Sequence, residues 1–248
     1  MTAPLHAAAR HPRLLKDMTP GQVADILADD PRLIIPVGTC EQHGPHLPLG
    51  TATIIADALA DDLSAEHGVI RAPTIEYGVN VGTERGFPGN ASMRKKTLHR
   101  LLNDLLATWE SSGFREFILL TAHDHDPHEE ALATVMTTVA RVCVVDVFAV
   151  DIADLLEGQT GHMHGCEVDT SLMLYLAPQH VHMELAQDSM MSREEVRRYR
   201  RGRLRVPRRS AGSIGRPTLA TAIKGQAIYD RIRQRVSDRV FRRPSPDE

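Results

Sequence analysis

The 248-residue sequence has few cysteines, few aromatic residues and no long apolar run. Its three cysteines, Cys40, Cys143 and Cys166, are an odd and sparse set, which argues against a disulfide framework and favours the reducing cytoplasm. No apolar run approaches the roughly 20 residues that a membrane helix needs, and residues 1–13 lack the apolar core of a secretory signal. The net charge of −3 does not point to nucleic-acid or membrane binding. We therefore expect a cytoplasmic globular protein with a small-molecule substrate, no nucleic-acid partner and no membrane partner.

Short apolar runs alternate along the sequence with stretches of helical periodicity. The runs predict buried strands at residues 33–37, 69–75, 117–121 and 142–150. Periodicity and end signals predict helices at residues 20–28, 53–66, 97–112, 129–140, 168–176 and 220–240, with a glycine-rich loop at 79–91. This alternation indicates an α/β fold with a mostly parallel central sheet flanked by helices on both faces. Since no repeat, linker or low-complexity segment interrupts it, we expect residues 1–248 to form one domain.

Acidic and imidazole side chains directly follow two of the predicted strands. The first cluster holds Glu41, His43 and His46, and the second holds His123, Asp124, His125, Asp126 and His128. If the two strands are parallel neighbours, both clusters lie at the same sheet edge, where ligands bind in open α/β folds. Residues two apart in an extended segment point the same way, so each pair Glu41/His43 and His123/His125 can share an ion. We therefore predict a metal site, and interpret His46 and His128 as polar loop residues.

Carboxylates and imidazoles suit Zn, Mn or Fe(II), and such an ion activates water and polarises a carbonyl. A third cluster, at residues 162–171, adds His162, His164, Glu167 and Asp169. A Ser-His-Asp hydrolase is the weaker alternative, because no Gly-x-Ser-x-Gly motif is present. No glycine-rich phosphate loop is present either. Cys40 and Cys166 are expected to be structural thiols. The arginine-rich segment at about 193–216 predicts a solvated helix and loop, an oligomer contact, or a site for a phosphorylated or carboxylated substrate.

Four segments resemble the creatininase (creatinine amidohydrolase) family: residues 36–51 with the run Gly-Thr-Cys-Glu-Gln-His-Gly-Pro-His, then 86–90, 164–174 and 212–222. They keep the order and rough spacing of the family between about residues 30 and 240. The resemblance implies a layered α/β fold and a ring-like hexamer, hence a homo-oligomer. It also implies a Zn, Mn or Fe site that hydrolyses cyclic amides, formamides or related C–N bonds.

The resemblance also implies roles for single residues. Glu41, His43 and His123 match metal ligands, and His125 falls where some members have a ligand glutamate. His164 matches a histidine proposed to pass protons to the substrate, and Glu167 matches a carboxylate of the same motif.

The sequence departs from the family at a metal-bridging aspartate, which is Ala52 here. Two close cations need negative charge between them. We therefore expect one divalent ion per chain, held by Glu41, His43, His123 and His125. Three residues are expected to be catalytic: His164, Glu167 and Asp124, with Asp126 as a supporting carboxylate. Residues 83–90 would form part of the substrate wall, with substrate contacts from Asn80, Glu84 and Phe87.

The sequence thus predicts a metal-dependent amidohydrolase that cleaves an amide-like C–N bond in a small polar molecule. One alternative is hydrolysis of a C–C or C–O bond, or isomerisation, in a cyclic biosynthetic intermediate. Another is an inactive scaffold that lost activity with the bridging aspartate, and a third is the processing of a peptide.

Overall fold

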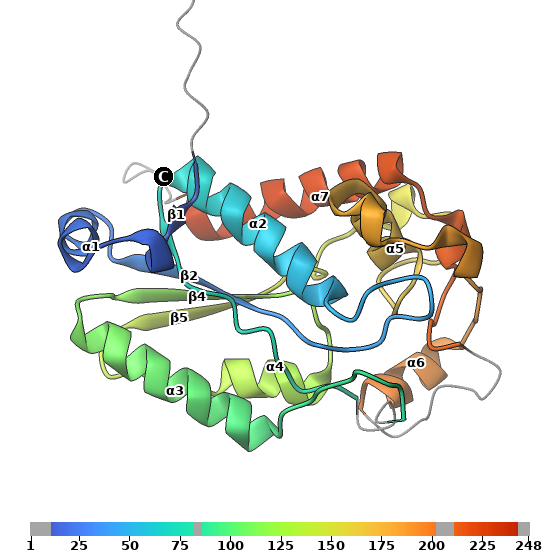
Figure 1. Cartoon of the computed structure of the whole chain (residues 1–248), viewed down its shortest axis with the longest axis horizontal. Coiled ribbons are helices and arrows are strands. Elements are labelled where there is room, and N and C mark those ends of the chain that lie inside the picture. The colour runs from blue at the N-terminus through green and yellow to red at the C-terminus, as the bar shows by residue number, and fades with distance from the viewer. Residues whose placement is uncertain (1–10, 82–85, 202–210, 243–248) are drawn as a thin grey trace, which may run out of the picture.

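The computed structural model describes residues 11–81, 86–201 and 211–242. Within them the strands form one parallel five-stranded sheet, in the order β1-β3-β2-β4-β5 (Figure 1). The strands are β1 (Arg13–Leu14), β2 (Arg32–Val37), β3 (Ile70–Arg71), β4 (Glu116–Thr121) and β5 (Arg141–Asp146). Because β2 and β4 are parallel neighbours, with Val37 opposite Thr121, the two polar clusters that follow them begin at the same edge of the sheet. The parallel α/β fold predicted from the sequence is confirmed.

Helices cover both faces of the sheet. They are α1 (Pro20–Leu27), α2 (Thr51–His67), α3 (Lys95–Ser111), α4 (Asp126–Ala133), α5 (Glu167–Leu176), α6 (Arg193–Arg200) and α7 (Ala222–Val236). Single 3-10 turns lie at Leu15–Asp17, Ala153–Leu155, Pro178–His180, Met183–Leu185 and Pro217–Leu219, and a π-helical turn at Ser237–Phe241. Figure 1 shows α2, α5 and α7 on one side of the sheet and α3 and α4 on the other.

The alternation of side chains along the central strands supplies both cores. Leu33, Ile35 and Val37 of β2 pack with α3, whereas Ile34 packs with α2, α5 and α7. All four side chains are buried, as expected for a parallel strand covered on both faces. None of the described helices is both long and apolar enough to cross a membrane.

Four elements are clearly shorter than the sequence predicts, and one of them is β5, which stops at Asp146 instead of residue 150. β3 covers only Ile70–Arg71 of the predicted strand 69–75, and α7 stops at Val236 before the π-helical turn. The helix predicted at 129–140 ends at Ala133. Residues 134–139 are rich in β-branched side chains, which disfavour helix. The carboxylate of Glu110 then accepts hydrogen bonds of 2.6–3.1 Å from the N–H groups of residues 138–140, which stabilises that segment as a loop.

Candidate metal centre

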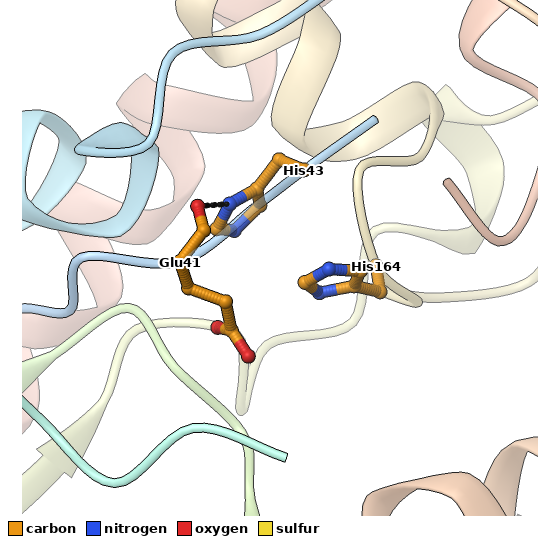
Figure 2. Close-up of side chains that lie close together, drawn as sticks. All are labelled: Glu41, His43 and His164. Carbon is orange, nitrogen blue, oxygen red and sulfur yellow. Dashed lines mark hydrogen bonds between the residues drawn. The ribbon is translucent and has the colours of Figure 1, made fainter. Parts of the chain in front are cut away.

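Three of the predicted site residues meet beyond the carboxyl ends of the central strands. Glu41, His43 and His164 each offer one ligand atom, and these atoms all lie within 4.8 Å of one another. Figure 2 shows the carboxylate of Glu41 and the two rings arranged around a common space. Glu41 and His43 come from the loop after β2, whereas His164 comes from the loop before α5. The fold therefore gathers a carboxylate and imidazoles that lie more than 120 residues apart in the sequence.

The carboxylate of Glu41 is fully buried and has an unsatisfied oxygen. Its Oε2 lies 3.0 Å from Nδ1 of His123, but the two are not aligned as a hydrogen bond, so no described donor satisfies Oε2. Among the described residues, Oε1 accepts only a long bond of 3.5 Å, from the N–H of Val81. Burial alone would raise the pKa of Glu41. The attraction of His123, His164 and His43 outweighs it and holds that pKa well below the usual range. A buried, ionised oxygen without a donor is well suited to a cation.

Backbone carbonyls orient all three imidazoles near this carboxylate. Nδ1 of His43 lies 3.0 Å from a carbonyl oxygen, Nε2 of His123 lies 3.0 Å from another, and Nε2 of His164 lies 2.7 Å from a third. The three carbonyls belong, in that order, to Glu41, Val79 and Gln42. Metal-binding histidines usually donate their second ring N–H to such a partner, which fixes the tautomer and the plane of the ring.

The cluster borders a narrow cavity of about 20 Å³, which is room for about one water molecule or ion. His43, His123 and His164 line it, and Val196 and Tyr199 of α6 complete the wall. Tyr199 is 3% exposed and packs with Val81, Met191 and Ile214. The donor set, the unsatisfied oxygen and the size of the cavity together fit one divalent ion of the Zn, Mn or Fe type.

Asp124, which also lines the cavity, belongs to a second buried network. Its Oδ2 lies 3.0 Å from Nδ1 of His162, whose Nε2 lies 2.8 Å from Oδ1 of Asp169. The ring of His162 stacks on Phe148 at 3.7 Å. Burial opposes protonation of His162, but the two carboxylates overcome it and raise its pKa well above the usual value. An imidazolium clamped between two carboxylates therefore fixes the position of Asp124.

Gly165 allows the loop that carries His164 to reach the centre. Its φ is +56°, and a Cβ atom at this position would lie 2.3 Å from the carbonyl oxygen of His43. Only glycine combines this backbone conformation with so close an approach.

Three of the predicted site residues lie outside the ligand group. His123 and His125, both predicted to be metal ligands, line the cavity but are not members of the group formed by Glu41, His43 and His164. Glu167, predicted to be catalytic, is fully buried in an ion pair of 2.7 Å with Lys224. It also accepts hydrogen bonds from the N–H groups of Glu157 and Gly158. This position explains Glu167 as a structural residue at the start of α5, so its predicted catalytic role is not supported.

The predicted substrate contacts are spread out. Asn80 is buried, and its Nδ2 donates to the carbonyl of Cys40, which steadies the loop before Glu41. Phe87 is half-buried and is not among the residues that line the cavity. Glu84 lies outside the described residues.

His46, His128 and Cys166 are buried and hydrogen-bonded. Burial lowers the pKa of His46 to about 4 and that of His128 well below its usual value, and it raises the pKa of the Cys166 thiol. We interpret these residues as structural.

The sequence prediction missed two parts of the site. His162 was grouped with its neighbours but given no role, although its spacing of two from His164 repeats the pattern of Glu41/His43. Val196 and Tyr199 are an apolar pair at i, i+3 on a helix that is otherwise charged, which is the signal that one side of α6 packs inward.

Comparison with known proteins agrees with this geometry. The family model described as "Creatininase: Creatinine amidohydrolase" matches residues 16–240. A protein of Mycolicibacterium smegmatis named mycofactocin precursor peptide peptidase is 30% identical over 226 residues, covering 86% of this chain and 85% of that protein. The 3-dehydro-scyllo-inosose hydrolase of Thermotoga maritima is 29% identical over 185 residues, covering 69% of this chain and 58% of its own length. A solved structure described as "Creatininase Mn" has the same fold, with a TM-score of 0.78 at 23% identity over 92% of this chain and 96% of that one.

Proposed function

The chain belongs to the creatininase family of metal-dependent amidohydrolases, and from this membership and the geometry of the centre we propose that it cleaves an amide C–N bond in a small polar molecule. One observation carries the proposal: a fully buried carboxylate oxygen of Glu41 lacks a described donor and faces imidazoles that backbone carbonyls hold in place. An inactive scaffold would gain little from keeping this carboxylate buried, because taking a charge out of water costs free energy even when imidazoles lie beside it.

One divalent ion would be held by Glu41, His43 and His164, with His123 beside them. When bound, the ion supplies a Lewis acid for the amide carbonyl and lowers the pKa of water. Asp124 lines the same cavity, so it is the group placed to take a proton from the attacking water and return it to the leaving nitrogen. His162 holds Asp124 in position, and Val196 and Tyr199 exclude bulk water.

His164 acquires a different role in this proposal from the proton transfer expected of it. Burial, with a contribution from His43, lowers the pKa of His164 to about 4, so the ring is neutral at pH 7. A neutral imidazole beside Glu41 is a ligand rather than an acid. The proton transfer then falls to Asp124.

A single ion per chain is consistent with Ala52. This residue is buried in the apolar core at the start of α2, and its methyl group offers no ligand in place of an aspartate. Within the described group of ligands, Glu41 is then the only carboxylate. One negative charge supports one divalent cation better than two.

Two other reactions stay open as candidates. Hydrolysis of a peptide bond is favoured by the relative named as a precursor peptide peptidase, which matches most of this chain. Hydrolysis of a C–C or C–O bond in a cyclic molecule is favoured by the relative named as an inosose hydrolase. A screen of lactams, formamides, short peptides and cyclic ketones with the metal-loaded protein separates the three.

Elemental analysis of the purified protein tests the metal centre. We expect about one equivalent of a divalent metal in the wild type and a loss of most of it in His43→Ala. The matched control is His182→Ala, because the His182 side chain is 61% exposed and belongs to neither candidate group of ligands in the described structure. Equal metal content in His43→Ala and the wild type would refute the centre, and two equivalents in the wild type would refute the single ion.

We also propose a homo-oligomer, which the family resemblance implies to be a hexamer. Tyr77 and Leu101 line one groove and are exposed, which supports an apolar contact there. Light scattering of the purified protein measures the assembly.

A further inference from the structure

A second, larger cavity adjoins the metal centre. It has a volume of about 600 Å³, against about 20 Å³ for the inner cavity, and Val81 and His125 line both. Its wall also contains Asn80, Arg94, Lys95 and Arg201. The two cavities therefore share a wall, and the outer one is large enough for the part of a substrate that does not react.

The described wall of the outer cavity carries only positive charge. Arg94, Lys95 and Arg201 line it, and no acidic residue does. Lys95 pairs with Glu130 and Arg201 lies 3.5 Å from Asp126, but all four of these side chains are 42–57% exposed. Ion pairs of this kind contribute about 0–1 kcal/mol, so an incoming anion can compete for both cations. Arg94 has no ion pair within the described part of the chain.

The start of α3 adds to this positive potential. Arg94 is its N-cap and makes no capping hydrogen bond through its side chain, and the first turn contains Lys95 and Lys96 but no acidic residue. Basic residues at a helix N-terminus are unfavourable, because that end already carries about half a positive charge. The fold thus concentrates positive charge at the wall of a cavity that shares Val81 and His125 with the cavity of the metal centre.

Asn80 provides an acceptor in the same wall. It is 5% exposed, its Nδ2 donates to the carbonyl of Cys40, and its Oδ1 has no described hydrogen-bond partner. The side chain of Asn80 therefore adds a polar, uncharged group to a wall whose described charges are all positive.

We propose that the outer cavity is an anion subsite, which binds a carboxylate or phosphate carried by the amide substrate while the scissile carbonyl reaches the metal centre past His125. Arg94, Lys95 and Arg201 bind the anionic group. This inference rests on the proposed amide hydrolysis and narrows its substrate to molecules with an anionic end. It also gives a function to Arg201, which belongs to the arginine-rich segment that the sequence singled out.

Ligand-observed NMR titration of the metal-loaded, full-length protein tests the subsite without requiring turnover. The probe is 4-oxopentanoate, a short ketone carboxylate that contains no hydrolysable C–N bond, and its neutral counterpart is 5-hydroxypentan-2-one. We expect the carboxylate to bind about tenfold more tightly than the neutral probe. Arg94→Gln and Arg201→Gln should each remove about tenfold of that affinity, since hydrogen bonds to charged groups contribute about this much.

The matched control is Lys96→Gln, which removes an exposed charge from the same turn of α3 but lies outside the cavity wall. It should leave the affinity for 4-oxopentanoate within about twofold of the wild type. Equal binding of the two probes, or an equal loss in Lys96→Gln and Arg94→Gln, would overturn the subsite. Inorganic phosphate that binds more tightly than 4-oxopentanoate, and needs Arg94, would support the subsite and identify a phosphate as its ligand.

The titration tests the anion subsite and the metal assay tests the metal centre, so one proposal can be refuted while the other stands. Anion binding that depends on Arg94, in a protein that lacks metal and hydrolyses no amide, would support the subsite and refute the proposed reaction. A metal-loaded amidase that binds both probes equally would do the reverse.

Discussion

Replacing Lys224 with methionine tests the structural role that its position gives to Glu167. The Nζ of Lys224 lies 2.7 Å from Oε1 of Glu167, whose side chain is fully buried, whereas Lys224 is 16% exposed. Lys224 also pairs with Glu157, which is 66% exposed and therefore contributes little. Lys224→Met thus leaves a buried carboxylate without its cation. The long methionine side chain keeps most of the packing of the lysine stem.

The size of the effect follows from this geometry. Two unit charges at 2.7 Å attract by about 6 kcal/mol at an effective dielectric constant of about 20, and much of this offsets the burial of Glu167. Removing one partner of a buried pair usually costs about 3–5 kcal/mol. We expect about 3 kcal/mol for Lys224→Met, because the N–H groups of Glu157 and Gly158 still bind the carboxylate. For a chain of this size that corresponds to a fall in Tm of roughly 6–12 °C.

Urea unfolding measures the change in the free energy of unfolding, and the double variant Lys224→Met/Glu167→Gln provides the control. Its loss of stability should be smaller than the sum of the two single losses by about 1–2 kcal/mol, because neutralising Glu167 removes the charge that Lys224 balances. At a temperature where all variants are folded, Glu167→Gln should keep its metal content and its kcat within about threefold of the wild type. A fall in kcat of a hundredfold or more in a fully folded Glu167→Gln, with unchanged metal content, would show that Glu167 is catalytic after all.

Two further predictions concern the centre itself. Gly165→Ala should lose most of the bound metal and at least about 2 kcal/mol of stability, because its Cβ would meet the carbonyl oxygen of His43 at a positive φ. The control Gly161→Ala should change neither the metal content nor the stability, because its Cβ meets nothing within 4 Å. Equal metal content in the two variants would contradict the packing argument. Because the pKa of His162 is raised, its interaction with Asp169 stabilises the fold fully below about pH 6.5, and this stabilisation is lost as the pH rises through the raised pKa. The difference in the free energy of unfolding between the wild type and His162→Gln, measured by urea unfolding, should therefore be larger at pH 6 than at pH 9.5. A difference that does not change with pH would refute the charged state of His162.

The central strands, and the edge of the sheet at which the site lies, could be predicted from the local pattern of apolar residues in the sequence. The runs at 33–37 and 117–121 are apolar without interruption, as strands buried on both faces are, and β2 and β4 match them within one residue. Parallel pairing then brings the polar clusters after them together, and the approach of Glu41 to His123 within 3.0 Å confirms that expectation. Chain order and strand direction alone were enough for this step.

The composition of the ligand group could not be read in the same way. Spacing two apart indicated His123/His125 as a pair, but their ring centroids lie 5.9 Å apart and His125, the N-cap of α4, is outside the ligand group. His164 joins Glu41 because Gly165 lets a distant loop approach His43, which depends on tertiary packing. Sequence periodicity contains no information about such a contact.

The carbonyl partners of the three imidazoles have a consequence for how the protein can change. Those carbonyls are main-chain atoms of Glu41, Gln42 and Val79, so exchanging the side chain of Val79 leaves its carbonyl group in the chain. The side chain of Gln42 is different, because its Nε2 also lies 3.0 Å from Nε2 of His164. The orientation of the rings therefore depends largely on the path of the main chain. Loops that choose the substrate can diverge through many replacements while the same reactive core persists, which makes the scaffold a ready starting point for evolving new specificities in the laboratory.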